Sequence, residues 1–232
     1  AVRQEAIDQT KAGIDAALEM GAPLMTLWLG QDGFDYSFQG DYARMWEDEV
    51  SGIREVAAHA PECMISVEYK PNEPRSYALM PDVATTLLAI DEVGLPNLGV
   101  TLDFAHVLYA DEMPAFAATL ISRRSRLLGV HLNDGYGKRD DGLMVGSVHP
   151  QATLELLWQI TRDRFDGVIY FDTFPDASGI DPVEECATNI EVTERLIAMA
   201  KRVAGDNALH EAIAAQDSPR SQRAVQRIMG GE

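Results

Sequence analysis

Residues 98–103 read Leu-Gly-Val-Thr-Leu-Asp, a short apolar run that ends in a carboxylate. Its length and its aliphatic side chains are typical of a buried β-strand. Four further apolar runs have the same character, at residues 24–29, 64–69, 127–132 and 167–172. Strands that are apolar along most of their length are buried on both faces, as in a parallel sheet.

The segments around these runs predict amphipathic helices, because apolar residues recur on one helical face. The predicted helices cover residues 2–20, 41–59, 80–94, 112–122, 151–163 and 181–204. Helices that alternate with buried strands indicate an α/β fold with a parallel sheet. Periodicity alone leaves two folds open, a doubly wound sheet and a (β/α)₈ barrel.

Polar residues lie at the carboxyl ends of four of the predicted strands. Glu68, Asp103, His131 and Asp172 follow one another at intervals of 35, 28 and 41 residues, about one β-α-β step each. Neighbouring parallel strands bring such residues together at one rim, where the active sites of barrels lie.

These four residues predict a metal site. A single acidic residue at a strand end is most often a helix cap, but four residues in consecutive units are harder to explain in that way. Converging carboxylates repel one another unless a cation or a proton lies between them. Carboxylates with one imidazole form a hard ligand set that suits Mn²⁺, Mg²⁺ or Co²⁺, and the sequence does not separate these three ions.

Composition excludes other classes of protein. The chain has 232 residues, of which 46% are hydrophobic, and 37 acidic residues against 19 basic ones give a net charge of −18. Neither nucleic acid nor an anionic membrane is an expected partner, and no apolar run is long enough for a membrane helix. Cys63 and Cys186 lie far apart, so we expect no disulfide framework and a cytoplasmic location.

One motif resembles a known family. Residues 68–75, Glu-Tyr-Lys-Pro-Asn-Glu-Pro-Arg, resemble the Glu-x-Lys-Pro-Asn-Glu-Pro-Arg motif of xylose isomerases, and residues 14–22 and 28–33 are similar to a helix and a strand end of that family. Residues 102–106 and 130–134 are closer to the L-rhamnose isomerase branch, with its Asp-x-x-His and His-x-Asn-Asp motifs.

The resemblance covers roughly residues 5–204 and implies a (β/α)₈ TIM barrel. It implies a divalent-metal-dependent sugar isomerase that interconverts an aldose and a ketose by a hydride shift. The four residues at the strand ends would bind the metal that holds a monosaccharide substrate. The sugar itself cannot be named from the sequence.

The resemblance also implies a second, catalytic metal, bound by Asp103, His106 and Asp140. Lys70 would contact the oxygen on the first carbon of the substrate, and Trp28 would form part of an apolar wall. From the residues alone, other roles stay open. Trp28 could belong to the core, Lys70 could be a solvated charge and His106 could cap a turn.

One position departs from the family pattern. Relatives carry an acidic residue where this chain has Gly142, so the second metal site stays open unless Asp141 replaces that ligand. Two other functions therefore remain. One is a ketose epimerase or a related sugar isomerase that works by proton transfer, with Glu68 and Asp172 as the carboxylate pair. The other is an inactive accessory subunit that binds metal and carbohydrate.

Length gives a prediction of its own, because a full barrel takes about 250 residues. Five strand–helix units in residues 1–204 look like strands four to eight of the family's barrel, so strands one to three are expected to be missing. Residues 205–232 are predicted to be a C-terminal extension with a short helix. Such tails often embrace a neighbouring subunit in this family, which implies a homo-oligomer.

Overall fold

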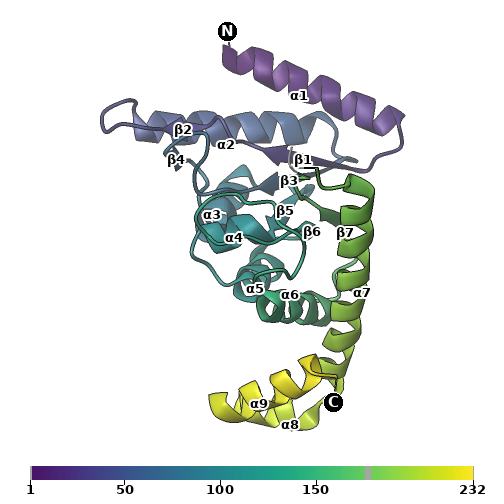
Figure 1. Cartoon of the computed structure of the whole chain (residues 1–232). Helices are drawn as coiled ribbons and strands as arrows, with labels where there is room; N and C mark the ends of the chain where they lie inside the picture. The colour runs from purple at the N-terminus through teal and green to yellow at the C-terminus, as the bar shows by residue number, and fades with distance from the viewer. Residues whose placement is uncertain (1, 176–178, 232) are drawn as a thin grey trace.

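The fold is described by a computed structural model, which covers residues 2–175 and 179–231. Five parallel strands form one sheet in the order in which they occur in the sequence (Figure 1). They are β1 (Leu24–Trp28), β3 (Met64–Glu68), β5 (Leu98–Asp103), β6 (Leu127–Leu132) and β7 (Val168–Phe171). Each strand pairs with the next one along the chain, as in the wall of a barrel. All five predicted strands are thus confirmed.

Helices connect these strands and cover the outside of the sheet (Figure 1). They are α1 (Val2–Glu19), α2 (Tyr42–His59), α3 (Val83–Val93), α5 (Pro114–Arg124), α6 (Pro150–Arg162) and α7 (Pro182–Gly205). Aspartates fix several of their first turns, because a carboxylate accepts hydrogen bonds from free backbone N–H groups. Asp41 caps α2 and Asp82 caps α3 in this way. The predicted helix bounds lie within about three residues of those observed.

Three short elements were not predicted. Helix α4 (Phe104–Tyr109) begins directly after β5, and strands β2 (Gly33–Phe34) and β4 (Tyr77–Ala78) form a small antiparallel sheet. At Gly33, φ is 140° and a Cβ atom would lie 2.0 Å from the Tyr77 carbonyl oxygen, so glycine is required there. These elements are too short to leave a periodic pattern in the sequence.

The C-terminal extension contains two helices where one was predicted. Helix α7 ends at Gly205, and α8 (Asn207–Ala214) and α9 (Ser218–Met229) follow it. Both extend to one side from the end of α7, below α6 in the view of Figure 1, and α9 contacts both α8 and α7. Amide hydrogen bonds join Gln151 of α6 to Gln222 and Gln226 of α9. The division at residue 204 stays a prediction.

Burial varies across the sheet. Every residue of the central strand β5 is buried, whereas the outer strands β1 and β7 leave Trp28 and Tyr170 each 49% exposed. The assignment of these strands to positions four to eight of a barrel stays a prediction. Within the described residues, no helix is long and apolar enough to cross a membrane.

Strand register places the polar residues. Trp28 of β1 lies opposite Glu68 of β3, and Asp103 of β5 lies opposite His131 of β6. The backbone N–H of Asp172 donates to the Leu132 carbonyl, which extends the pairing of β6 and β7 by one residue. The carboxyl ends of the strands therefore carry their polar side chains at one level.

Candidate metal centre

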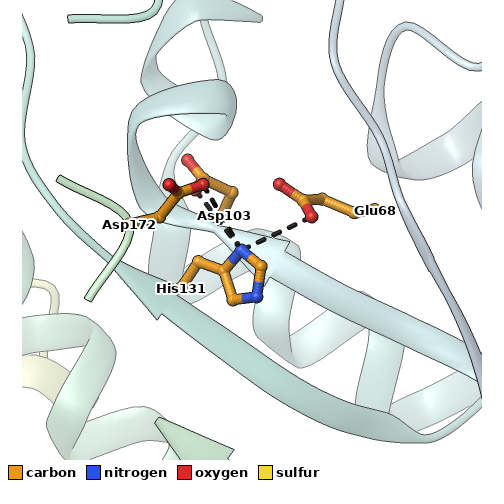
Figure 2. Close-up of side chains that lie close together, drawn as sticks. All are labelled: Glu68, Asp103, His131 and Asp172. Atoms are coloured by element: carbon orange, nitrogen blue, oxygen red, sulfur yellow. Dashed lines mark ion pairs between the residues drawn. The ribbon is translucent and has the colours of Figure 1, made fainter. Parts of the chain in front are cut away.

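The structure brings four of the predicted site residues together. Glu68, Asp103, His131 and Asp172 each offer an atom that lies within 4.8 Å of the others (Figure 2). They come from the ends of β3, β5 and β6 and from the residue after β7. Residues 2–175 and 179–231 contain one such group of possible metal ligands. It is the group that the strand ends predicted.

The geometry around His131 fits a bound cation. Its Nδ1 atom lies 3.4 Å from a Glu68 oxygen, 3.6 Å from an Asp172 oxygen and 3.8 Å from an Asp103 oxygen (Figure 2). This buried nitrogen has no hydrogen-bond partner in the described part of the chain. Ligand atoms about 2.0–2.3 Å from a common ion would be separated by about 3.0–3.7 Å. The four residues therefore fit a divalent ion.

Burial and charge shift the pKa values within this group. Burial raises the pKa of Asp103 to about 6, and the Glu68 carboxylate adds to this effect, although His106 opposes it. Burial alone would lower the pKa of His131, but the carboxylates of Asp172 and Glu68 outweigh it and raise that pKa to about 10. Without an ion, the group therefore keeps a proton on His131.

We expect metal binding to release this proton. At neutral pH, an ion that binds the imidazole nitrogen must displace about one proton, since only the neutral ring is a ligand. The apparent affinity for Mn²⁺ should then rise with pH, up to the His131 pKa of about 10. Calorimetric titrations in two buffers with different ionisation enthalpies would measure the number of protons released.

A suitable control for this titration is His59→Gln, because His59 lies at the end of α2 and pairs with Asp15. This variant should release as many protons as the unmodified chain. A proton count near zero from about pH 6 to pH 9 would contradict a protonated His131.

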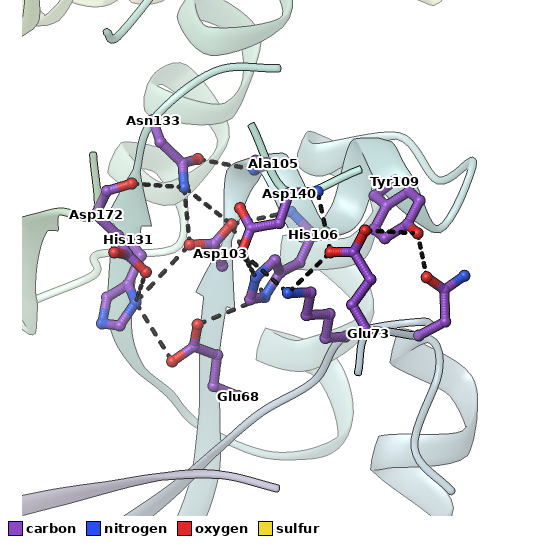
Figure 3. A network of polar contacts seen from close by, with 12 residues as sticks. Glu68, Glu73, Asp103, Ala105, His106, Tyr109, His131, Asn133, Asp140 and Asp172 are labelled. Atoms are coloured by element: carbon purple, nitrogen blue, oxygen red, sulfur yellow. Dashed lines mark hydrogen bonds and ion pairs between the residues drawn. The ribbon is translucent and has the colours of Figure 1, made fainter. Parts of the chain in front are cut away.

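The residues predicted for a second ion are close together but engaged otherwise. Asp140 Oδ2 accepts a hydrogen bond from Lys70 Nζ at 3.1 Å and lies 3.2 Å from His106 Nε2 (Figure 3). Burial alone would raise the pKa of Asp140, but the contacts with His106 and Lys70 lower it below its ordinary value. An ammonium group thus neutralises the carboxylate that the second ion would need.

Asp141 does not replace the ligand that Gly142 lacks. Its carboxylate accepts hydrogen bonds from Arg139 at 2.7 Å and from the Tyr136 backbone at 2.8 Å. Lys70 and His106 thus engage Asp140 Oδ2, whereas the buried Asp140 Oδ1 has no hydrogen-bond partner among the described residues. The second metal stays a prediction, and no step of the chemistry below depends on it.

Lys70 is neither solvated nor on the surface. It is 9% exposed, and its Nζ atom lies 5.4 Å from the centre of the Trp28 ring and 3.3 Å from a Glu73 oxygen. Trp28 is half-exposed and lines the same pocket as Glu68 and Lys70, so it is not a core residue. His106 is buried, and its backbone N–H donates to Asp103 at the start of α4.

Two further residues belong to this network, and the roles of both were missed in the sequence. Glu73 contacts Lys70 and accepts a hydrogen bond from the Tyr109 hydroxyl (Figure 3). Asn133 donates hydrogen bonds to Asp103. Both residues lie within the sequence motifs at residues 68–75 and 130–134, so the motifs could have pointed to them. A motif does not say which atoms its residues contact.

The fold and this site define a barrel protein of the TIM class with a candidate metal centre at the carboxyl rim of its strands. The family model for xylose isomerase-like TIM barrels matches residues 1–202. The chain belongs to this family.

The most similar proteins include both isomerases and epimerases. A xylose isomerase of Thermus thermophilus is 26% identical over 177 residues, which make up 74% of this chain and 46% of that protein. The chain thus spans about half the length of the curated relatives that it matches. A solved D-tagatose 3-epimerase-like protein has a TM-score of 0.75 at 19% identity and covers 88% of this chain and 72% of its own.

A xylose isomerase domain protein of Alicyclobacillus acidocaldarius has a TM-score of 0.65 at 22% identity, with 86% of this chain and 73% of that chain covered. At these identities, the solved structures show the fold alone. The family match and the curated xylose isomerases relate this chain to proteins of sugar interconversion.

Proposed function

We propose that this chain interconverts an aldose and a ketose with the help of a divalent metal ion, by a hydride shift between neighbouring carbons. The observation that supports this most is the group of four potential ligands with the buried ammonium of Lys70 nearby. When bound, such an ion polarises two adjacent sugar oxygens as a Lewis acid. Mn²⁺, Mg²⁺ and Co²⁺ all suit the ligand set.

The reaction balances because the hydride moves from the second carbon to the first, while the hydroxyl proton of the second carbon moves to the oxygen of the first. The residues of the chain would hold and stabilise the reacting groups. Glu68, Asp103, His131 and Asp172 would hold the ion, and therefore the sugar, in one position. The Lys70 ammonium would stabilise negative charge that develops on the oxygen of the first carbon. The ring of Trp28 packs beside Lys70, where it would keep water away from the reacting carbons.

A second candidate is an epimerase that removes a proton and returns it. The described residues contain one group of possible metal ligands, and Asp140 accepts a hydrogen bond from Lys70. Both observations favour chemistry with a single ion. Glu68 lies at the end of β3 and Asp172 directly after β7, on opposite sides of the group, and they could act on two faces of a substrate carbon. The solved D-tagatose 3-epimerase-like protein has the same fold.

Deuterium on the second carbon of an aldose distinguishes a hydride shift from proton transfer in an isomerase, and deuterium on the third carbon of a ketose detects an epimerase. A hydride shift should keep the label on the neighbouring carbon of the ketose, whereas proton transfer should lose it to water. The experiment uses a panel of aldoses and ketoses with Mn²⁺ or Co²⁺, with EDTA as the control, and follows the label by NMR.

Loss of the aldose label would contradict the hydride shift, and loss of the ketose label without conversion of any aldose would support the epimerase. A folded chain that binds the ion but converts no sugar would support the accessory subunit instead. The monosaccharide substrate is part of this proposal. The homo-oligomer and the cytoplasmic location stay predictions.

A further inference from the structure

We propose that Asn133 is a positioning residue, which holds the Asp103 carboxylate and the Asp172 backbone in the geometry that binds the ion. The inference rests on the metal centre of the proposed function. Asn133 directly follows β6 and is completely buried, at 0% exposed. The Asn133 side chain is uncharged, so it acts on its neighbours through hydrogen bonds.

The first contact is with Asp103. The Asn133 side-chain Nδ2 lies 3.2 Å from Asp103 Oδ1 and 3.0 Å from Oδ2 (Figure 3). The His106 backbone N–H donates to Oδ1 as well, at 2.9 Å. These donors fix the plane of the carboxylate, and Oδ2 then lies 3.8 Å from His131 Nδ1, on the side of the ligand group.

Asn133 also reaches the neighbouring strand ends. Its Nδ2 donates to the Asp172 carbonyl at 3.1 Å, and its Oδ1 accepts from the Ala105 N–H at 2.8 Å (Figure 3). These partners determine the orientation of the amide, since a flipped amide would place its oxygen against the Asp103 carboxylate. One side chain thus joins the ends of β5, β6 and β7.

This matters most for Asp172. Strand β7 is an outer strand of the sheet, and the Asp172 side chain is more exposed than that of Glu68 or Asp103. Among the described residues, two backbone contacts hold its position relative to the other ligands, the N–H bond to Leu132 and the carbonyl bond to Asn133. Removal of the amide would release one of them.

The chain offers a matched control for this role. Asn97 is also buried, at 5% exposed, and its Nδ2 donates to the carbonyls of Ala57 at 2.9 Å and Cys63 at 3.0 Å. It precedes β5, at the opposite end of that strand from Asp103. Asn97→Ala therefore removes a comparable set of buried hydrogen bonds and leaves the ligand group intact.

The test compares Mn²⁺ affinity, measured by EPR titration, between Asn133→Ala and Asn97→Ala. Loss of a hydrogen-bonding partner of a metal ligand typically weakens binding by about 10–100-fold. We expect this increase in Kd for Asn133→Ala, and a Kd close to that of the unmodified chain for Asn97→Ala. Circular dichroism confirms that each sample is folded.

Asn133→Ser is the second variant, because its hydroxyl can still donate one hydrogen bond and a smaller cavity forms. It should bind Mn²⁺ more weakly than Asn97→Ala, and it can be measured if Asn133→Ala does not fold. Asn133 variants that bind Mn²⁺ within about twofold of Asn97→Ala would overturn the inference.

Because Mn²⁺ affinity is measured without sugar, the test of Asn133 does not depend on the proposed reaction. Weaker Mn²⁺ binding without turnover of any sugar would support the role of Asn133 and count against the proposed isomerisation. Sugar turnover together with unchanged Mn²⁺ affinity in the Asn133 variants would support the proposed isomerisation and count against the role of Asn133. An unmodified chain that binds no ion would overturn both.

Discussion

Glu68→Gln should abolish metal binding and, with it, sugar turnover. We expect the Kd for Mn²⁺ to rise by more than the roughly 10–100-fold that follows from loss of a ligand's hydrogen-bonding partner, because a ligand itself is lost. Turnover should fall to the level seen with EDTA. Glutamine keeps the shape of the side chain, so the change removes a charge and leaves the packing of β3 intact.

The physical reason lies in the charge of the group. Glu68 is one of three carboxylates that surround His131, and its Oε2 atom lies 3.4 Å from the imidazole Nδ1. A neutral amide oxygen attracts a divalent ion much less strongly than a carboxylate does. The same change should lower the pKa of His131, since Glu68 is one of the two carboxylates that raise it most.

Glu62→Gln is the matched control for this prediction. Glu62 is exposed and precedes β3, at the opposite end of that strand from Glu68. Its removal should leave both Mn²⁺ affinity and turnover unchanged. Tight Mn²⁺ binding by Glu68→Gln, measured by EPR or calorimetry, would contradict the assignment of Glu68 as a ligand.

Lys70→Met should lower kcat by about 100- to 1,000-fold and leave Mn²⁺ affinity nearly unchanged. This is the typical effect of removing one group that stabilises charge in the transition state. Methionine keeps much of the length of lysine and its packing beside Trp28. The separation of kcat from metal affinity follows because the contacts of Lys70 are with Trp28, Glu73 and Asp140 rather than with the four grouped ligands.

The same change should alter Asp140. Burial alone would raise the pKa of this half-buried carboxyl, but hydrogen bonds with His106 and Lys70 hold it below its ordinary value. Without the Lys70 ammonium, the pKa should rise, so Asp140 should take up its proton at a higher pH than in the unmodified chain. Lys138→Met is the control, because Lys138 is exposed on the loop that carries Asp140. Equal kcat values for the two variants would refute the role of Lys70.

Much of the site could be predicted because strand ends are predictable. An apolar run that ends in Asp or Glu marks both a buried strand and its carboxyl end, as residues 98–103 do. In a parallel sheet, consecutive strands bring these ends together without any knowledge of the loops. The order of the strands along the chain is therefore enough to predict that Glu68, Asp103, His131 and Asp172 lie together.

The contacts made by residues in the loops could not be predicted from the sequence. The partner of Asp140 is Lys70, which lies 70 residues away, and no local pattern links the two. Helix α4 is six residues long, and its start depends on the Asp103 side chain. Asn133 was visible in a motif, but its three strand-end contacts depend on how β5, β6 and β7 are paired.

The placement of the four ligands at the ends of four different strands has a topological consequence. An ion bound by all of them would act as a non-covalent cross-link that closes three successive loops of the chain, between residues 68 and 103, 103 and 131, and 131 and 172. Closing loops of this length restricts the unfolded chain. Part of the binding free energy of the ion would therefore be folding free energy, and one ion would join the last unit of the sheet to the three units before it.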